Sequence, residues 1–255
     1  MKTIRSLYLI INYKTLIVTT LSLISTWICM RYNFQADFPL TLVGIAIVFP
    51  VVFSIDSAYK RRERALAILA DFKGHLKSLY MGATDWLVIE DAEYHKQYKT
   101  DIIDVYSAVR AFFISKEDDE EGEKRIAHAI AKLSATVQKL REFDLPSVEI
   151  SRLNQYLSKL WIAIDSLKSI YFYPTPITLR AYSRVFIYSF PVLYGPYFVY
   201  AAQSYSVGLE YMMPVLFSFI LVSLDNIQAH LESPFDQIGE DDIKFNVEKF
   251  ERLLK

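Results

Sequence analysis

The sequence predicts an all-α integral membrane protein with four transmembrane helices and a cytoplasmic helical domain. Three observations lead to this class. Hydrophobic residues make up 53% of the 255-residue chain, above the usual range of soluble domains, and the mean hydropathy is positive. Long uncharged runs lie near both ends, and the charged middle repeats its apolar residues at helical spacing. Apolar surface on this scale is expected to lie in a bilayer.

The first two uncharged runs predict an N-terminal transmembrane hairpin over residues 1–56. Thr15–Met30 is bounded by Lys14 and Arg31, and Phe38–Ile55 follows after a short loop. A helix needs about 20 residues to cross a bilayer, so each run is long enough when its flanking side chains reach back to the surface. The short loop makes the two helices an antiparallel pair.

A second hairpin is predicted over residues 185–225. The third run is Val185–Leu209 and the fourth is Tyr211–Leu224, with a polar turn around Ser204–Glu210. The fourth run has only about 14 residues, short for a span. It is therefore expected to be tilted, to be partly shielded by protein, or to continue past Asp225 on a face away from lipid.

Basic residues set the orientation. They precede the first span (Lys2, Arg5, Lys14), follow the second (Lys60, Arg61, Arg62, Arg64) and precede the third (Arg180, Arg184). The loops on the other side carry only Arg31. Since cytoplasmic flanks are enriched in Lys and Arg, both termini and residues 57–184 are placed in the cytoplasm. The expected location is the cell membrane, which is the inner membrane if the source is bacterial.

Residues 57–184 are predicted to form the cytoplasmic helical domain. A helix from about Glu90 to Ser115 places Ile102, Val105, Val109 and Phe112 inward. Two further stripes step by three and four on either side of a break at Pro146: Ile126, Ile130, Leu133, Val137 and Leu140, then Ile150, Leu153, Leu157, Leu160, Ile164, Leu167 and Tyr171. The acidic stretch Glu117–Glu123 between these helices is expected to be an exposed loop.

Few side chains suit catalysis or cofactor binding. The single cysteine, Cys29, lies in an apolar run, and the four histidines have no acidic or cysteine partners at metal-ligand spacing. The predicted spans hold no histidine and no paired carboxylates, and no glycine-rich phosphate loop occurs. The net charge of −1 gives no support to nucleic-acid binding. We therefore expect no enzymatic activity, no cofactor, no metal site and no nucleic-acid partner.

One apolar stripe in the second span suggests a pore. Ile45, Phe49 and Phe53 fall at i, i+4 and i+8, so they share one helix face over roughly 12 Å of rise. If several subunits surround an axis with this face inward, the stripe becomes stacked apolar rings that can gate by dewetting. An apolar stripe of this kind also suits contact with lipid or with a neighbouring helix.

Three segments, taken in order, resemble the bestrophin family of ion channels. They are Gly44–Phe53 with Ser57–Ala65, which looks like the second helix of the family; Tyr173–Ile177 with Ala181–Ser183, which resembles its proline-containing lead into the third span; and Leu231–Phe235 with Gly239–Ile243, which is similar to its acidic, Pro-Phe signature. The likeness extends over nearly the whole chain, including the span count and the long cytoplasmic insertion.

This resemblance implies a homopentameric channel with a narrow hydrophobic neck in the membrane and a wider cytoplasmic vestibule. Ile45, Phe49 and Phe53 match the neck positions of the family. Alignment with the family places a second, cytoplasmic constriction near Ser147 or Val148. The implied partners are the lipid bilayer, further copies of the chain and permeating monovalent ions.

The signature residues are Pro234, Phe235, Asp241 and Asp242, in the C-terminal segment 226–255. Animal bestrophins hold calcium with a longer acidic run, whereas this chain has only Glu240, Asp241 and Asp242 there. Calcium takes six or more oxygen ligands, so no calcium requirement is expected. Asp241 and Asp242 also suit the N-cap of a last helix from about Ile243 to Leu254.

Monovalent anions are the expected permeating ions, with chloride first among them. Phenylalanine ring edges carry partial positive charge, so edge-on rings of Phe49 and Phe53 tolerate a dehydrating anion better than an aliphatic ring does. The neck has no charged side chain, so this reasoning leaves room for a monovalent cation channel of the same fold. A membrane scaffold or sensor that does not conduct, whose helical domain binds a partner, is a third interpretation.

Overall fold

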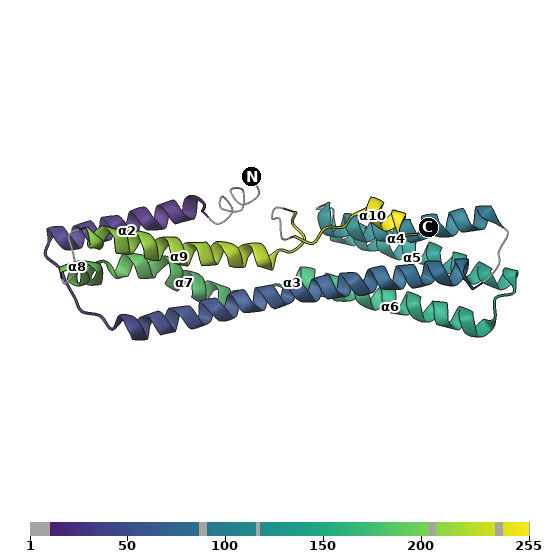
Figure 1. Ribbon diagram of the computed structural model, residues 1–255, viewed down its shortest axis with the longest axis horizontal. Helices are drawn as coiled ribbons and strands as arrows, with labels where there is room; N and C mark the ends of the chain where they lie inside the picture. Colours follow the sequence, from purple (N-terminus) through teal and green to yellow (C-terminus); the bar gives the residue numbers. More distant parts are fainter. Residues whose placement is uncertain (1–10, 87–90, 116–117, 204–207, 238–241, 255) are drawn as a thin grey trace. The chain divides into compact units, whose positions relative to one another are not determined.

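The structure, a computed structural model, describes residues 11–86, 91–115, 118–203, 208–237 and 242–254 (Figure 1). Every regular element within these ranges is a helix, in agreement with the predicted all-α class. The chain forms two compact units: unit 1 comprises Met1–Arg62, Pro174–Ser233 and Ile238–Asp241, and unit 2 comprises Glu63–Tyr173, Pro234–Gln237 and Asp242–Lys255. These limits lie several residues from those expected for the cytoplasmic domain, whose assignment to one side of the membrane stays a prediction.

Unit 1 is built from helices at both ends of the sequence: α2 (Tyr13–Arg31), the first part of α3 (Leu40–Thr84), α7 (Ile177–Leu193), α8 (Gly195–Gln203) and α9 (Leu209–Glu232). Helix α2 packs against α7, α8 and α9, and α7 and α8 both pack against α9. The shared core is apolar and includes Val18, Ile47, Val51, Ile187, Phe190, Phe198 and Val222. Residues far apart in sequence thus make one apolar helical layer.

Three helices in the described part of the chain are long and apolar enough to cross a membrane, and a fourth span arises if one bent pair is counted. The three are Tyr13–Arg31, Val43–Thr84 and Leu209–Glu232. The bent pair joins the helix that ends at Leu193 to the helix that begins at Gly195, with a bend of 45°. These findings agree with three to four of the predicted spans.

The two later spans differ from a simple hairpin of straight helices. The third run, expected to be one helix, is divided into α7 and α8 at Tyr194, just before Gly195 and Pro196. Helix α9 continues to Glu232, with Asp225 buried, so the fourth run does extend past Asp225. Within the expected polar turn, residues 204–207 lie outside the described residues, and Gly208 and Glu210 belong to the start of α9.

Helix α2 supplies hydrogen bonds where α7 breaks. In a regular helix the Val192 carbonyl accepts from the amide of Pro196, which has no N–H. Instead, the Ser25 hydroxyl donates to the Val192 carbonyl at 2.6 Å, and the Ser22 hydroxyl donates to the Pro191 carbonyl at 2.5 Å. Gly195 permits this close packing, because a Cβ there would lie 2.7 Å from Ser25 Oγ.

Gly195→Ala is expected to lower the free energy of unfolding by about 1–3 kcal/mol, the usual cost of an overpacked contact. The added methyl would also lie 3.2 Å from the Ser25 backbone carbon, which cannot move aside as a side chain can. Thermal unfolding in detergent, followed by circular dichroism, measures the change. Gly44→Ala is the matched control, since a Cβ at Gly44 meets nothing within 4 Å. Equal melting temperatures for the two variants would contradict the packing argument.

Unit 2 contains the rest of α3 with α4 (Ala92–Ile114), α5 (Asp119–Lys139), the 3₁₀ turn η1 (Leu140–Phe143), α6 (Ser147–Phe172) and α10 (Val247–Arg252). Helix α5 packs against α4 and α6, and α10 packs against α4. All the predicted inward positions of α4 are buried, as are those of α5 and η1. In α6 the stripe is buried from Ile150 to Leu167, while Tyr171 near its end is exposed. The predicted helical periodicity is thus confirmed.

Two local predictions in unit 2 are wrong. Asp119–Glu123, expected to be loop, form the first turns of α5, where carboxylates interact favourably with the helix dipole; they are exposed except at Gly122. The last helix is only Val247–Arg252, and its N-cap is Asn246, whose side chain accepts from the Lys249 amide at 2.7 Å. Asp242 precedes this cap and is buried, because Ile243 and Phe245 pack into the core before the helix begins.

Candidate functional site

The stripe of Ile45, Phe49 and Phe53 lies on α3 and is exposed in the single chain. The exposed fractions of the three residues are 49%, 56% and 59%. The rings of Phe49 and Phe53 stack, with centroids 6.2 Å apart and 26° between their planes. Ile47 and Val51, on the opposite side of the helix, are buried in the core of unit 1. One face of this segment is therefore packed, and the other is available to lipid, a neighbouring chain or an aqueous axis.

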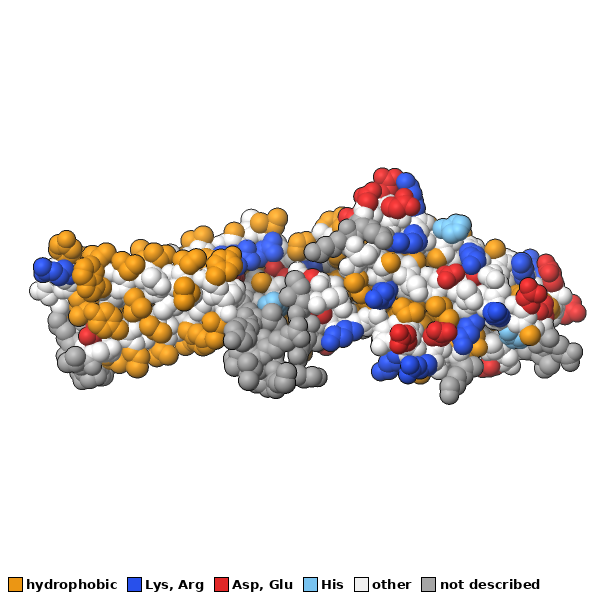
Figure 2. All heavy atoms as spheres, turned by 90° about the horizontal axis from the view of Figure 1, so that it is seen from above, with side chains coloured by type: hydrophobic (Ala, Val, Ile, Leu, Met, Phe, Trp, Pro, Cys, Tyr) orange, Lys and Arg blue, Asp and Glu red, His pale blue; other side chains and the backbone are white. Residues whose placement is uncertain are grey.

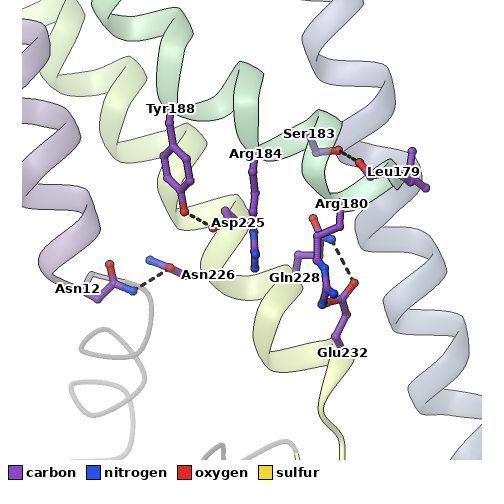
Figure 3. A network of polar contacts seen from close by, with 10 residues as sticks. All are labelled: Asn12, Leu179, Arg180, Ser183, Arg184, Tyr188, Asp225, Asn226, Gln228 and Glu232. Atoms are coloured by element: carbon purple, nitrogen blue, oxygen red, sulfur yellow. Dashed lines mark hydrogen bonds and ion pairs between the residues drawn. The ribbon is translucent and has the colours of Figure 1, made fainter. Parts of the chain in front are cut away.

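A second feature of unit 1 is a pair of acidic residues held by arginines across α7 and α9 (Figure 3). Asp225 is almost fully buried and accepts from Arg184 Nε at 3.1 Å and from the Tyr188 hydroxyl. The neighbouring Asn226 accepts from the Asn12 side chain at 2.8 Å, and this contact reaches the start of α2. A buried carboxylate needs such partners, because removing a charge from water is costly.

Glu232 forms the second half of this network. Its carboxylate accepts from Arg180 at 2.8 Å and from Gln228 at 3.3 Å. Its main-chain carbonyl accepts from Arg61 at 3.2 Å. The C-terminal end of α9 is thus tied to α7 and to the segment of α3 that follows the predicted second span.

Sequence reasoning used Arg180 and Arg184 only as indicators of topology and missed this network. A signal was present: Asp225, Gln228 and Glu232 recur at i, i+3 and i+7 at the end of an apolar helix, so they share one helix face. Polar residues grouped on one face of such a helix indicate partners within the protein.

Of the signature residues, Pro234, Phe235 and Asp242 lie in unit 2, where Phe235 acts as a packing anchor. Phe235 is buried, and its ring stacks on Phe113 with centroids 4.6 Å apart. The chain then turns back, since the Ile243 amide donates to the Pro234 carbonyl at 2.8 Å and the Gln237 side chain donates to the Ile243 carbonyl at 2.9 Å. The structure therefore brings Pro234, Phe235 and the neighbourhood of buried Asp242 together, while Asp241 lies outside the described residues.

The remaining predicted positions are simple to place. Ser147 and Val148 occupy the first turn of α6 after Pro146, and both are exposed. Among the residues that the structure describes, no group of three or more His, Cys, Asp or Glu side chains is arranged to hold a metal ion. The role of a constriction at Ser147 or Val148 stays a prediction.

The two units have different surfaces (Figure 2). Hydrophobic side chains cover the visible face of unit 1, whereas acidic and basic side chains are spread over unit 2. On α2 the exposed apolar side chains include Leu16, Ile24, Trp27 and Ile28. Contiguous apolar surface of this kind indicates contact with a membrane or with protein.

Comparison with known sequences finds no match to this chain, whereas comparison with known structures does. No model of a known protein family matches the sequence, and no curated protein matches it either. The fold does match a crystal structure of a bacterial bestrophin homologue from Klebsiella pneumoniae, with a TM-score of 0.81 and 16% identity over 95% of this chain and 96% of that chain. A singly substituted form of a Klebsiella pneumoniae homologue matches with the same score and identity, over 95% and 98%.

The apolar helices and these structures define the class: the described part of the chain has the all-helical fold of a membrane protein. Within that class it has the bestrophin fold, which it shares over nearly its whole length with the bacterial homologues. The resemblance predicted from three short segments is thereby confirmed at the level of the fold.

Proposed function

We propose that this chain is a member of the bestrophin family and forms a homopentameric ion channel without enzymatic activity. The permeating ions are monovalent anions, with chloride expected, and they cross the membrane through a neck on the pentamer axis. The observation that carries the proposal is the exposed stripe of Ile45, Phe49 and Phe53, on a chain with the bestrophin fold.

The exposed face of α3 supports an axial neck. Two stacked phenylalanine rings and an isoleucine stand on the side of the helix away from the packed core of unit 1. When copies of this face surround an axis, they form three apolar rings about 6 Å apart, one helical turn each. A constriction lined in this way passes ions when it is wetted and blocks them when it dries.

Ring electrostatics favour anions at such a neck. The edge of a phenylalanine ring is partially positive and its face partially negative, so edge-on rings stabilise a passing anion. No side chain of the stripe is charged, hence selectivity depends on ring orientation and on charges beyond the neck. A monovalent cation channel of the same fold is the alternative within this proposal.

The proposal includes the rest of the permeation path and the orientation. A second constriction lies at Ser147 or Val148, both exposed at the start of α6. Both termini and the helices of unit 2 are cytoplasmic, since the basic residues flank the spans on that side. Conduction needs no calcium, because the acidic segment of residues 240–242 is too short to supply a full ligand set.

Single-channel recording in planar bilayers under asymmetric sodium chloride tests the function. We expect a reversal potential near the chloride equilibrium value, and larger currents from the triple variant Ile45→Ala, Phe49→Ala, Phe53→Ala, because smaller side chains widen and wet the neck. The matched control is Leu16→Ala, Ile24→Ala, Ile28→Ala, which truncates three exposed apolar residues on α2. This control should conduct like the parent.

Three other outcomes would each correct a different part of the proposal. A reversal potential near the sodium value would keep the channel and replace the anion by a cation. If the current increases equally in the neck variant and in the control, Ile45, Phe49 and Phe53 do not form the neck. No current from any variant, in protein shown by mass photometry to be oligomeric, would favour the scaffold.

A further inference from the structure

A groove with a volume of about 390 Å³ opens between α2 and α7 in unit 1. It is lined by two cations, a tyrosine and three aliphatic side chains: Lys14, Arg184, Tyr188, Ile17, Val18 and Leu21. The hydrogen bonds from Ser22 and Ser25 to α7 fix the alignment of the two helices. Lys14 lies about two turns before Ser22 on α2, and Arg184 lies about two turns before Pro191 on α7. The two cations therefore lie at the same end of the groove.

Within the described residues, the charged end of the groove carries more positive than negative charge. Arg184 is paired with the carboxylate of Asp225, which also accepts a hydrogen bond from the neutral Tyr188 hydroxyl, so the second cation of the groove, Lys14, is left without a carboxylate of its own among the described residues. Lys14 is half-buried, and its ammonium makes no hydrogen bond or ion pair with the described part of the chain. Two cations and one carboxylate leave one positive charge among the described residues. This charge matches the single negative charge of a phosphodiester.

The other wall of the groove is apolar and follows α2 into its uncharged run. Ile17 and Leu21 lie one turn apart and are half exposed, while Val18 between them is buried. From Lys14 to Leu21 the helix rises about 10 Å, so the groove passes from charge to hydrocarbon over that length. An amphiphile with an anionic head and an acyl chain fits this order, whereas a soluble anion would use only the charged end.

We propose that this groove binds an anionic phospholipid, with its phosphodiester at Lys14 and Arg184 and an acyl chain along Ile17 and Leu21. The membrane leaflet on the side of the basic flanks supplies the lipid. The site does not depend on conduction, so loss of the channel proposal would leave it standing.

Native mass spectrometry of the purified protein, with dioleoyl phosphatidylglycerol or dioleoyl phosphatidylcholine added, tests this site. We expect the anionic lipid to bind about fivefold more tightly than the zwitterionic one, the effect of one interfacial charge. Lys14→Gln should abolish that preference. Ile17→Trp keeps the charges and fills the groove, so it should weaken binding of both lipids. Arg31→Gln, at the other end of α2, removes a cation outside the groove and should bind like the parent.

Several results would contradict the proposal that the groove binds an anionic phospholipid. Equal affinity of the parent for the two lipids would remove the charge argument, and equal losses in Lys14→Gln and Arg31→Gln would show general attraction to charge. Displacement of the lipid by soluble glycerophosphoglycerol at similar concentration would identify a free-anion site instead. If the parent binds neither lipid and Ile17→Trp lowers the subunit number, the groove is a contact between copies of the chain. Melting temperatures of all variants, measured alongside, confirm that each is folded.

Discussion

Asp225→Ala is expected to lower the free energy of unfolding by about 3 kcal/mol, the low end of the range for breaking a buried ion pair. The substitution leaves the Arg184 guanidinium in a partly buried position without its carboxylate, and the Tyr188 hydroxyl without its acceptor. Arg184 keeps some access to water, with a side chain 38% exposed, which limits the loss. Thermal unfolding in detergent measures the effect as a lower melting temperature.

Asp56→Ala is the matched control for this prediction. Asp56 also pairs with a cation, Lys60, at 2.7 Å, but both side chains are solvent-exposed and lie one turn apart on α3. Exposed pairs of this kind contribute less than about 1 kcal/mol. The double variant Arg184→Leu, Asp225→Leu should regain most of the lost stability, since apolar pairs often replace buried ion pairs without loss of stability. If Asp225→Ala and Asp56→Ala melt at the same temperature, the network does not stabilise unit 1.

Phe235→Ala is expected to destabilise unit 2 by about 3–5 kcal/mol, as for other buried phenylalanines. Phe235 belongs to an aromatic cluster in which its ring stacks on Phe113 and lies near Tyr171 and Phe245. The alanine variant loses these contacts and leaves a cavity between α4, α6 and the C-terminal segment. Faster hydrogen–deuterium exchange in α4 and α6, together with a lower melting temperature, is the expected result.

Tyr173→Ala serves as the control, because Tyr173 is an aromatic residue at the end of α6 in the same unit but is largely exposed. Its exchange rates should match those of the parent. Phe235→Leu should fall between parent and alanine variant, since leucine refills part of the cavity. Unchanged exchange in Phe235→Ala would mean that the signature segment does not anchor unit 2.

The elements that could be predicted from the sequence are those whose signal is local and periodic. The stripes of α4, α5 and α6 repeat every three to four residues, and each such repeat specifies one buried face. The N-cap residue of a helix is harder to predict, because several polar residues near the start of a helix can each act as the cap. Asn246 caps α10 in place of the expected Asp241 or Asp242, since burial of Ile243 and Phe245 moves the helix start along the chain.

Features that depend on distant partners could not be predicted in the same way. Arg184 and Asp225 are 41 residues apart, and Arg180 and Glu232 are 52 apart, so no local pattern connects them. The stripe of Ile45, Phe49 and Phe53 is an intermediate case. Its common face follows from spacing alone, and its exposure follows from packing within one chain, but the ring it is proposed to form requires other copies.

The break between α7 and α8 has a consequence for the order in which its hydrogen-bonding groups are synthesised. Helix α8 has nine residues, about 14 Å of helix, less than half the hydrocarbon thickness. An unsatisfied carbonyl at the break would cost several kcal/mol in lipid. The serine donors lie on α2, 169 and 167 residues ahead of the carbonyls to which they donate. The ribosome therefore delivers the donors long before the acceptors, so α2 is already complete when the carbonyls at the break between α7 and α8 are synthesised.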